Sequence, residues 1–326
     1  MRAPVVLFGR ERFTAERAWT DLAPLLPGWE IRTCHPAAVG EHLGGVDVVC
    51  PFGATIDRAV LDAGEFGLVN QFGVGLEKVD AERATQLGVW VARVPGDVGG
   101  NADSVAELAI LHLLALVRRL RDAQATLVSR RWERRPTGGS LAGATVAIVG
   151  LGAIGTALAR RLAPFGTRLI GVRAHADRGG PPEVEFVTGP DRLTEALGAA
   201  DMVVCCAMFD GGSTPMFGAR EFAAMRPGAI FVNVARGGLV DEAALLAALE
   251  SGHLGGAGLD VHAAEPADPE SALLAHPRVL ATPHVGALTD AMFRRTGEAF
   301  AANLLRWASG QPPRWAVNRP VAERRR

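Results

Sequence analysis

The 326-residue chain contains no tyrosine, a single lysine and only four cysteines, and each scarcity excludes a kind of site. Without tyrosine, dehydrogenase mechanisms that depend on a Tyr–Lys proton donor are excluded. Because Lys78 is the sole lysine, P-loop and Schiff-base chemistry have almost no candidate residue. Cys34, Cys50, Cys205 and Cys206 form no C-x-x-C pair, so we expect buried, reduced thiols and no metal site.

A long apolar run and an excess of one charge are also missing. The most apolar stretch, residues 105–117, contains Glu107 and His112 and is too short to span a bilayer. The N-terminal apolar residues 5–8 are too few for a signal peptide, so we expect a cytoplasmic protein with no membrane partner. A formal net charge of −1 argues against nucleic acid as the main partner.

What the chain does contain is an alternation of short apolar strands with helical or polar stretches. This βαβ rhythm predicts parallel sheets covered by helices, and the length is sufficient for two domains with sizeable cores. In the first hundred residues the candidate strands are Val5–Phe8, Val46–Cys50, Leu68–Asn70 and Val89–Ala92. Later candidates are Thr145–Val149, Arg168–Val172, Met202–Ala207, Ile230–Val234, Gly256–Val261 and Val279–Thr282.

Two helices can be predicted from their ends and apolar faces. One begins at Ser104, which is spaced from Glu107 as in a capping box. The other, from about 289 to 309, follows the last strand, and its apolar face must be buried elsewhere, most simply on the first domain. The apolar face expected for the first helix contains Leu108, Leu111, Ala115 and Leu116.

Residues 145–155 read T-V-A-I-V-G-L-G-A-I-G, an apolar strand that leads into a glycine turn and then a helix. In such a turn, Gly150 allows the tight bend, Gly152 lets the backbone approach a pyrophosphate, and Gly155 lets helix and strand pack closely. The phosphates would contact unpaired N–H groups at the start of the helix, where Ala153 and Ile154 lie. The pattern therefore predicts a dinucleotide site.

Because this turn lies in mid-chain, other chain segments flank the nucleotide-binding domain on both sides. We predict a Rossmann domain at residues 98–285, inserted into a flavodoxin-like substrate domain made of residues 1–97 and 286–326. Both are α/β domains with doubly wound parallel sheets. A ligand cleft between the domains is expected, because open α/β sheets bind ligands at the carboxyl ends of their strands.

Three later segments each carry a polar residue at the end of a predicted strand: Arg236, Glu265 and His284. Strand ends in a doubly wound sheet face the cofactor, so we expect these side chains to converge there. An arginine fork can bind a carboxylate and polarise the neighbouring carbonyl. A histidine can donate a proton to that carbonyl oxygen while a carboxylate keeps the imidazole charged. The set suits reduction of a carbonyl beside a carboxylate.

Taken singly, each of these residues also has a structural reading. Arg-Gly-Gly could form a surface turn, Glu265-Pro266 an ordinary loop, and His284 a local hydrogen bond, as most histidines do. The other seven histidines are given this reading, with His262, just after Asp260, as the nearest rival to His284. The joint occurrence of the three residues favours a catalytic site.

On these residues the chain resembles the D-isomer-specific 2-hydroxyacid dehydrogenase family, which includes phosphoglycerate, glycerate/hydroxypyruvate and D-lactate dehydrogenases. The resemblance covers nearly the whole chain. It rests on five motifs in order: N-x-x-S-V-A-E (101–107), G-x-G-x-x-G (150–155), N-V-A-R-G-G-L-V-D-E (233–242), G-L-D-V…E-P (258–266) and P-H-V-G-A-L-T (283–289).

The resemblance implies that Arg236 binds the substrate, that Glu265 tunes His284, and that His284 transfers the proton. It also implies that backbone N–H groups around Val74 and Gly75 hold the substrate carboxylate. A homodimer and a small 2-oxo or 2-hydroxy acid as substrate are implied as well. The remaining expected cofactor-binding residues are Asp260, near the nicotinamide amide, and Ser104, Ala207, Thr214 and Ala235.

The coenzyme-binding segment departs from the NAD pattern, which places an acidic residue about 20 positions beyond the glycines. Here Arg173 stands 18 positions after Gly155, and His175 and Arg178 follow it. A cation at this place favours NADP, with Arg173 on the 2′-phosphate. The alternative is that Arg173 stacks on the adenine and that NAD serves equally well.

Two further departures concern the loops. Asp210 stands where the family usually has an early threonine, and Thr214 is the candidate for the role of the later threonine in this loop. Phe52 is large and apolar where several relatives carry a small or charged residue, which hints at a substrate without a phosphate.

The sequence therefore predicts reversible reduction of a small 2-oxo acid to a D-2-hydroxy acid, with NADP or NAD as coenzyme. Two alternatives stay open: a non-catalytic, nucleotide-sensing protein like the co-repressors related to this family, and a formate- or phosphite-type dehydrogenase. A methyltransferase would share the glycine-rich turn but would have no use for the three polar residues.

Overall fold

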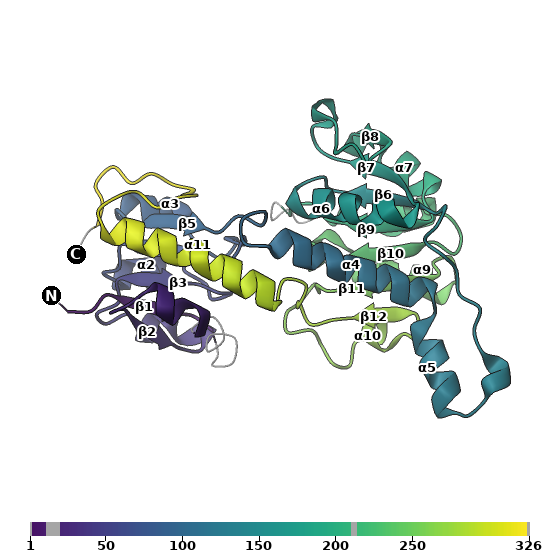
Figure 1. The fold of residues 1–326 in the computed structure, drawn as a ribbon, viewed down its shortest axis with the longest axis horizontal. Helices are drawn as coiled ribbons and strands as arrows, with labels where there is room; N and C mark the ends of the chain where they lie inside the picture. Colours follow the sequence, from purple (N-terminus) through teal and green to yellow (C-terminus); the bar gives the residue numbers. More distant parts are fainter. Residues whose placement is uncertain (1, 11–19, 210–213, 325–326) are drawn as a thin grey trace. The chain divides into compact units, whose positions relative to one another are not determined.

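The computed structural model describes residues 2–10, 20–209 and 214–324. The chain forms two compact units, one made of Met1–Asn101 with Leu288–Arg326, and the other of Ala102–Ala287. Each unit contains one parallel sheet with its helices, as Figure 1 shows. The predicted α/β class with two doubly wound sheets is confirmed.

The first unit has a five-stranded sheet in the order β2-β1-β3-β4-β5, and every strand pair is parallel. This is the strand order of flavodoxin-like folds. The strands are β1 (Val5–Phe8), β2 (Glu30–Thr33), β3 (Val48–Cys50), β4 (Leu68–Gln71) and β5 (Trp90–Arg93). The helices are α2 (Arg58–Ala63), α3 (Ala81–Gln86) and α11 (Asp290–Ala308), with the short η1 (Ala23–Leu25) and η2 (Pro36–Glu41).

The second unit has a seven-stranded parallel sheet in the order β12-β11-β10-β9-β6-β7-β8. The order reverses between β6 and β9, as in Rossmann folds, and ligands bind at such a switch point. The strands are β6 (Thr145–Val149), β7 (Arg168–Val172), β8 (Phe186–Thr188), β9 (Met202–Cys205), β10 (Ile230–Asn233), β11 (Gly256–Leu259) and β12 (Val279–Ala281). The α-helices are α4 (Asn101–Val117), α5 (Leu120–Val128), α6 (Ala153–Leu162), α7 (Leu193–Ala199), α8 (Ala219–Ala224), α9 (Glu242–Glu250) and α10 (Ala272–Ala275). The 3₁₀ turns are η3 (Trp132–Arg134), η4 (Ala163–Phe165), η5 (Ala176–Arg178), η6 (Pro190–Arg192) and η7 (Gly237–Leu239).

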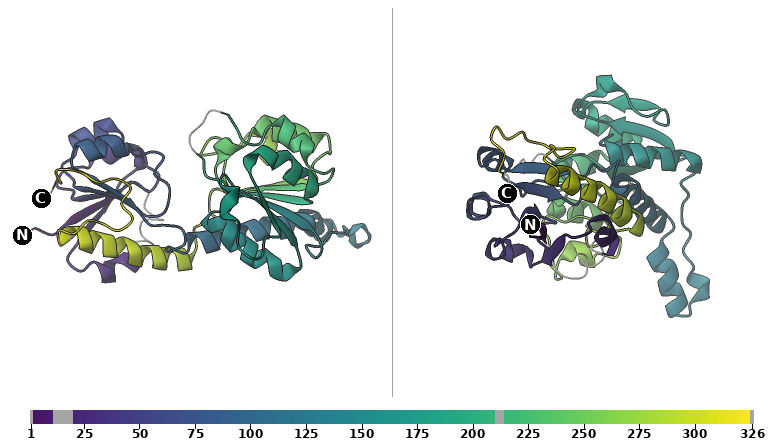
Figure 2. Two further views of the ribbon diagram at one scale, coloured as in Figure 1. Left: turned by 90° about the horizontal axis from the view of Figure 1, so that it is seen from above. Right: turned by 60° about the vertical axis from the view of Figure 1, so that its left-hand side comes forward.

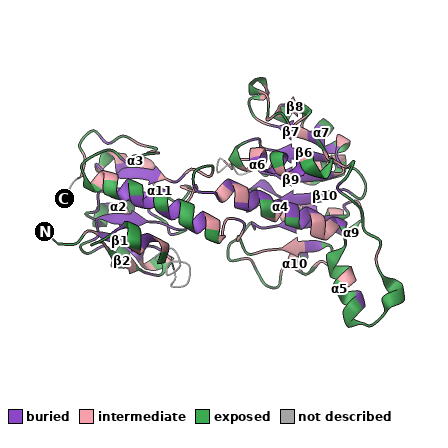
Figure 3. Ribbon diagram, viewed as in Figure 1, coloured by how far each residue is buried: buried purple, intermediate pink, exposed green. Residues whose placement is uncertain are grey.

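The central strands β9, β10 and β11 of the second unit are buried at every position because helices cover both faces of the sheet, which Figure 2 shows. Val203 and Cys205 of β9 belong to the core on one face, and Met202 and Val204 to the core on the other. The burial colours of Figure 3 show the same pattern, with buried strands and helices that are exposed on their outer faces. All four cysteines are buried and free, as predicted.

The strand predictions missed β2 and β8. Each of them is the strand at one edge of its sheet. An edge strand has one neighbour and needs less apolar surface. The sequence E-I-R-T of β2 accordingly has no buried position, and the three residues of β8 have one. The predicted central strands are present, with ends shifted by one or two residues.

The prediction for α4 was wrong in its start and in its face. The helix begins at Asn101, directly after Gly100 at φ +73°, so Ser104 lies inside it and no capping box forms with Glu107. Leu111 is 53% exposed. The buried face contains Val105, Ala106, Ala109, Ile110, His112, Leu113 and Val117.

The last helix agrees with the prediction, since Thr289 caps α11 by accepting the Met292 N–H and Ser309 follows its end. It packs along β4 of the first unit. In the parts of the chain that are described, no helix combines the length and the apolarity that crossing a membrane requires.

Candidate active site

The glycine turn between β6 and α6 has the stereochemistry that a pyrophosphate site needs. Gly150 has φ +103° and lies against the Cys206–Ala207 peptide at the end of β9, so no side chain fits there. A Cβ on Gly155 would collide with the carbonyl oxygen of Gly150, whereas a Cβ on Gly152 would meet nothing within 4 Å. The close packing is thus at the first and third glycines, and the open side is at the second. These residues fit a dinucleotide.

Arg173 directly follows β7, where the ribose of such a cofactor is expected. Its backbone N–H donates to the Thr188 carbonyl (3.0 Å), and its Nη1 donates to the Gly179 carbonyl (2.7 Å). No carboxylate in the described ranges forms an ion pair with Arg173. The side chain is therefore held by a backbone carbonyl, and its positive charge has no carboxylate partner among these residues.

The other predicted cofactor residues lie at three places in the second unit. Ala207 follows β9, Ala235 is buried after β10, and Ser104 is buried in α4. Thr214 is exposed, and Asp210 lies outside the described residues.

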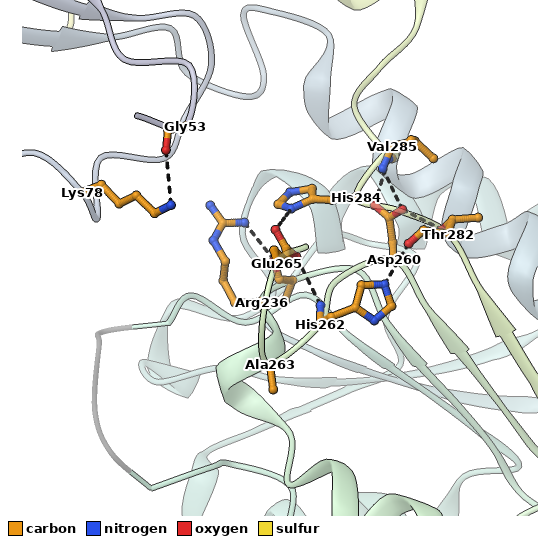
Figure 4. A network of polar contacts seen from close by, with 12 residues as sticks. Gly53, Lys78, Arg236, Asp260, His262, Ala263, Glu265, Thr282, His284 and Val285 are labelled. Atoms are coloured by element: carbon orange, nitrogen blue, oxygen red, sulfur yellow. Dashed lines mark hydrogen bonds and ion pairs between the residues drawn. The ribbon is translucent and has the colours of Figure 1, made fainter. Parts of the chain in front are cut away.

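Arg236, Glu265 and His284 come from the loops after β10, β11 and β12, which are neighbours in the sheet. Glu265 and His284 are in direct contact, with His284 Nδ1 2.7 Å from Glu265 Oε2. Figure 4 shows the Arg236 side chain beside this pair. A Cβ on Gly237 would collide with the His262 carbonyl, so the loop that carries Arg236 packs directly on the loop that carries Glu265. The structure thus brings the three residues together at the carboxyl ends of three neighbouring strands.

The Arg236 loop is shaped by Asn233, the last residue of β10. Its Oδ1 accepts the Ala235 N–H (3.0 Å) and its Nδ2 donates to the Arg236 carbonyl (3.0 Å). Arg236 Nη1 donates to the Ala235 carbonyl (2.8 Å). A single buried amide therefore sets the path of the backbone where the strand ends.

The pKa of the Glu265 carboxyl reflects opposing effects. Burial raises it, but the hydrogen bond and charge of His284, with the His262 N–H and charge, lower it more, so the pKa lies below its ordinary value of 4.5. The His262 N–H donates to Glu265 Oε1 at 3.2 Å, so both carboxylate oxygens have a donor. Glu265 is therefore an ionised partner for the imidazole at neutral pH.

The turn that carries His284 is held by Asp260, which is 2% exposed. Asp260 Oδ1 accepts from Thr282 Oγ1 (2.7 Å) and from the Val285 N–H (2.9 Å), while Oδ2 accepts from the Gly286 N–H (2.8 Å). The His284 N–H donates to the Asp260 carbonyl (2.8 Å). His284 has φ +52°, and this network holds it in that conformation.

Several residues of the site were not recognised from the sequence. His262, read as structural, donates its N–H to Glu265, and its Nε2 lies 3.1 Å from the Thr282 carbonyl, so it joins two of the loops. Glu242 accepts the Ala263 N–H (2.8 Å) and so also holds the loop that carries Glu265. Glu242 ends the N-V-A-R-G-G-L-V-D-E motif and Thr282 directly precedes the P-H-V-G-A-L-T motif, which was the available signal.

His112 had no such signal, because it is one polar residue in the apolar run of α4. It is fully buried, and its Nε2 lies 3.3 Å from Thr282 Oγ1. Since Thr282 donates its proton to Asp260, His112 Nε2 must be the donor in this contact. Burial lowers the pKa of His112, against smaller raising effects of Asp260 and the Gly258 backbone, so a neutral ring is favoured.

The predicted substrate residues Val74 and Gly75 belong to the first unit, in the turn after β4. The turn starts at Gly73, with φ +136°, and all its residues are half-buried. It contains no third glycine, and the next helix, α3, begins only at Ala81, so it differs from the dinucleotide turn of the second unit.

Comparison with known proteins shows the relationship directly. Residues 110–286 match the family model described as "D-isomer specific 2-hydroxyacid dehydrogenase, NAD binding domain". The chain is 36% identical over 293 residues to a glyoxylate reductase of Thermococcus onnurineus, covering 86% of this chain and 85% of that one. It is 33% identical over 275 residues to a D-3-phosphoglycerate dehydrogenase of Archaeoglobus fulgidus, of whose length it spans 50%.

Among solved structures, an NADPH-dependent glyoxylate/hydroxypyruvate reductase of Sinorhizobium meliloti, in complex with NADP and malonate, has a TM-score of 0.80 to this chain. It is 30% identical and covers 100% of this chain and 99% of its own. A Rossmann sheet with a glycine turn at its switch point defines the class as a dinucleotide-binding α/β protein. The chain belongs to the D-isomer-specific 2-hydroxyacid dehydrogenase family and is an NAD(P)-dependent dehydrogenase.

The glycine turn makes a paired prediction. Gly155→Ala forces a Cβ into a backbone carbonyl and should lower the free energy of unfolding by about 1–3 kcal/mol. Gly152→Ala meets open space and should unfold like the wild type while binding NADPH and NADH much more weakly. Chemical denaturation and coenzyme titration by fluorescence measure the two effects. Equal loss of stability in both variants would contradict this reading of the turn.

The lowered pKa of Glu265 predicts a pH-dependent contribution to stability. A depressed carboxyl pKa stabilises the folded state above the unfolded value of about 4.5, and the contribution is lost as the pH falls through the folded value. The melting-temperature gap between wild type and Glu265→Gln should therefore be larger at about pH 6 than at about pH 3.5. Glu270→Gln, at an exposed carboxyl, is the matched control. A difference in melting temperature that stays constant between these two pH values would refute a lowered pKa for Glu265.

Proposed function

We propose that the enzyme reduces a small 2-oxo acid of the glyoxylate or hydroxypyruvate type to the corresponding 2-hydroxy acid, of D configuration where a stereocentre forms. The observation that carries this proposal is the contact of 2.7 Å between Glu265 and His284. The names of the relatives from Thermococcus onnurineus and Sinorhizobium meliloti support the substrate class. Phe52, a buried apolar residue, supports a substrate without a phosphate.

In this proposal the domain of residues 98–285 binds the coenzyme and the remainder binds the substrate. The coenzyme supplies the hydride. The N–H groups of Val74 and Gly75 and the guanidinium of Arg236 bind the substrate carboxylate, and Arg236 polarises the neighbouring carbonyl. His284 uses Nδ1 to donate to Glu265, so Nε2 is the nitrogen that donates the proton to the carbonyl oxygen.

The cofactor-binding residues in this proposal are the glycine turn with Ala153 and Ile154, and the further set Ser104, Arg173, Ala207, Thr214, Ala235 and Asp260. Asp260 also has a structural task, because its two side-chain oxygens hold the turn of His284. Its expected place near the nicotinamide amide stays a prediction.

The test is a panel of 2-oxo acids with NADPH and with NADH, together with formate and phosphite as donors in the reverse direction. Turnover is expected with glyoxylate or hydroxypyruvate. Turnover of formate or phosphite alone would replace the proposal by the other dehydrogenase type. No turnover with any compound, despite coenzyme binding, would favour the non-catalytic alternative.

Replacing the proposed acid tests the mechanism. His284→Gln keeps a polar side chain but removes the proton donor, so kcat for reduction should fall by about 10²–10⁴. The dissociation constant for NADPH should stay within about twofold, because the glycine turn is unchanged. His253→Gln, a histidine whose ring contacts the Met225 carbonyl, is the control. Wild-type turnover in His284→Gln would refute the role of this residue.

We also propose that NADP is preferred to NAD, since the positive charge of Arg173 stands where NAD sites have a carboxylate. The complex of the Sinorhizobium meliloti relative with NADP supports this preference. Arg173→Asp should reverse the ratio of kcat/KM for NADPH and NADH. Arg168→Asp, at the other end of β7, should leave the ratio unchanged. A wild-type enzyme with strong bias to NADH would end the idea.

Two further expectations remain proposals: a homodimer and a cytoplasmic location. The dimer is supported by α5 and the residues after it, which extend away from the sheet of the second unit in Figure 1. Large apolar side chains are exposed on this segment, namely Leu120, Leu127, Val128 and Trp132. A second copy of the chain would cover them.

A further inference from the structure

The turn after β4 in the first unit, residues 73–76, has three successive carbonyl groups held by hydrogen bonds. Each carbonyl has a different donor, and two of the donors are side chains at strand ends. The Val94 N–H donates to the Gly73 carbonyl (3.0 Å), Arg93 Nη1 to that of Val74 (3.4 Å), and Gln71 Nε2 to that of Gly75 (2.7 Å). The carbonyl side of the turn is thus fully occupied.

This arrangement determines where the N–H groups of the turn are directed. A trans peptide is planar, so a carbonyl fixed in one direction places the N–H of the next residue in the opposite direction. The N–H groups of Val74, Gly75 and Leu76 therefore face away from the three donors. Within residues 2–10, 20–209 and 214–324, none of the three has a hydrogen-bond acceptor, and the turn is only half-buried. Successive N–H groups of this kind form an anion-binding nest.

The Gln71 side chain is used at both ends. Its Oε1 accepts the Phe52 N–H (3.0 Å) while its Nε2 holds Gly75, so it ties this turn to the loop after β3. That loop is conformationally demanding, with φ +46° at Phe52 and +106° at Gly53. Lys78 Nζ makes a second tie by donating to the Gly53 carbonyl (3.2 Å), as Figure 4 shows.

Gln71 and Arg93 are cross-strand partners at the ends of β4 and β5. Paired residues project from the same face of a sheet, which explains how both side chains reach the same turn. The Gln71 bond is the shorter of the two, and Arg93 adds positive charge on the carbonyl side of the turn.

We propose that Gln71, assisted by Arg93, is a positioning residue for the substrate carboxylate. Gln71 orients the Leu76 N–H through the Gly75 carbonyl, and Arg93 orients the Gly75 N–H through the Val74 carbonyl, so that these N–H groups stay presented to the ligand. Without the amide, the Gly75 peptide is free to rotate its carbonyl towards the carboxylate, where two negative partial charges repel. The inference rests on the proposed function for the identity of the ligand, a small 2-oxo acid.

The first test removes both hydrogen bonds at nearly constant shape. Gln71→Met should raise KM for the 2-oxo acid on the order of tenfold, the effect of one to two lost hydrogen bonds, with kcat and the NADPH dissociation constant changed by less than about threefold. Gln86→Met, at an exposed glutamine on α3, is the matched control. An unchanged KM, or a parallel loss of kcat and melting temperature, would overturn the proposal.

The second test uses a change of charge. Gln71→Glu keeps an acceptor for Phe52 but sets a carboxylate oxygen against the Gly75 carbonyl, so KM should rise more than in Gln71→Met. Acidification should restore the variant, because a protonated carboxyl can donate to Gly75 as the amide does. KM of Gln71→Glu relative to wild type should therefore fall as the pH falls. A ratio independent of pH would contradict a positioning role.

A binding measurement separates this inference from the proposed function. Oxamate, an unreactive 2-oxo acid analogue, should shift the amide NMR resonances of Val74, Gly75 and Leu76 in the full-length wild type and bind about tenfold more weakly to Gln71→Met. This result without turnover of any 2-oxo acid would leave the inference standing and the proposed function refuted. Turnover with equal oxamate affinity in both proteins would refute the inference alone.

Discussion

One buried carboxylate, Asp260, determines the geometry of the turn that carries His284, a member of the catalytic set proposed for the second unit. Its side chain binds one hydroxyl and two backbone N–H groups of residues 282–286, and its carbonyl binds the His284 N–H. Hydrogen bonds to a charged group contribute about 1.5–3 kcal/mol each, which offsets a cost of order 1–3 kcal/mol for a non-glycine residue at positive φ. His284 is thereby held with its ring against Glu265.

The same principle recurs at the other loops, in both units. Parallel strands end with backbone groups that have lost their sheet partners, and buried or half-buried groups of this kind need new ones. Asn233 supplies them for the Arg236 loop, Glu242 for the loop before Glu265, and Gln71 for the turn at Gly75. The chemistry-bearing side chains are therefore positioned by polar residues that do not themselves carry the chemistry.

The parts of the fold that the sequence predicted are those governed by local rules. The central strands can be recognised in the sequence by their nearly continuous apolar residues, because helices bury them on both faces. The glycine turn is recognisable because each of its glycines stands where a side chain would block the tight bend, the phosphates or the packing of helix on strand. The edge strands β2 and β8 were not predicted, because almost none of their residues is buried and they therefore carry no apolar run. The face of α4 was misread because most of its residues are apolar, so periodicity does not identify the buried side.

By itself, the sequence determined the fold class, the dinucleotide turn, and Arg236, Glu265 and His284 as residues at consecutive strand ends. Those conclusions depend on residue type and on spacing along the chain. Only the tertiary structure decided which other residues hold the loops of Arg236, Glu265 and His284 in place. The partners of Asp260 lie 22 to 26 positions away, and His112 reaches Thr282 across 170 positions. The order of the strands in the sheet makes these residues neighbours. That order follows from the packing of the whole sheet, and it cannot be read from a local sequence pattern.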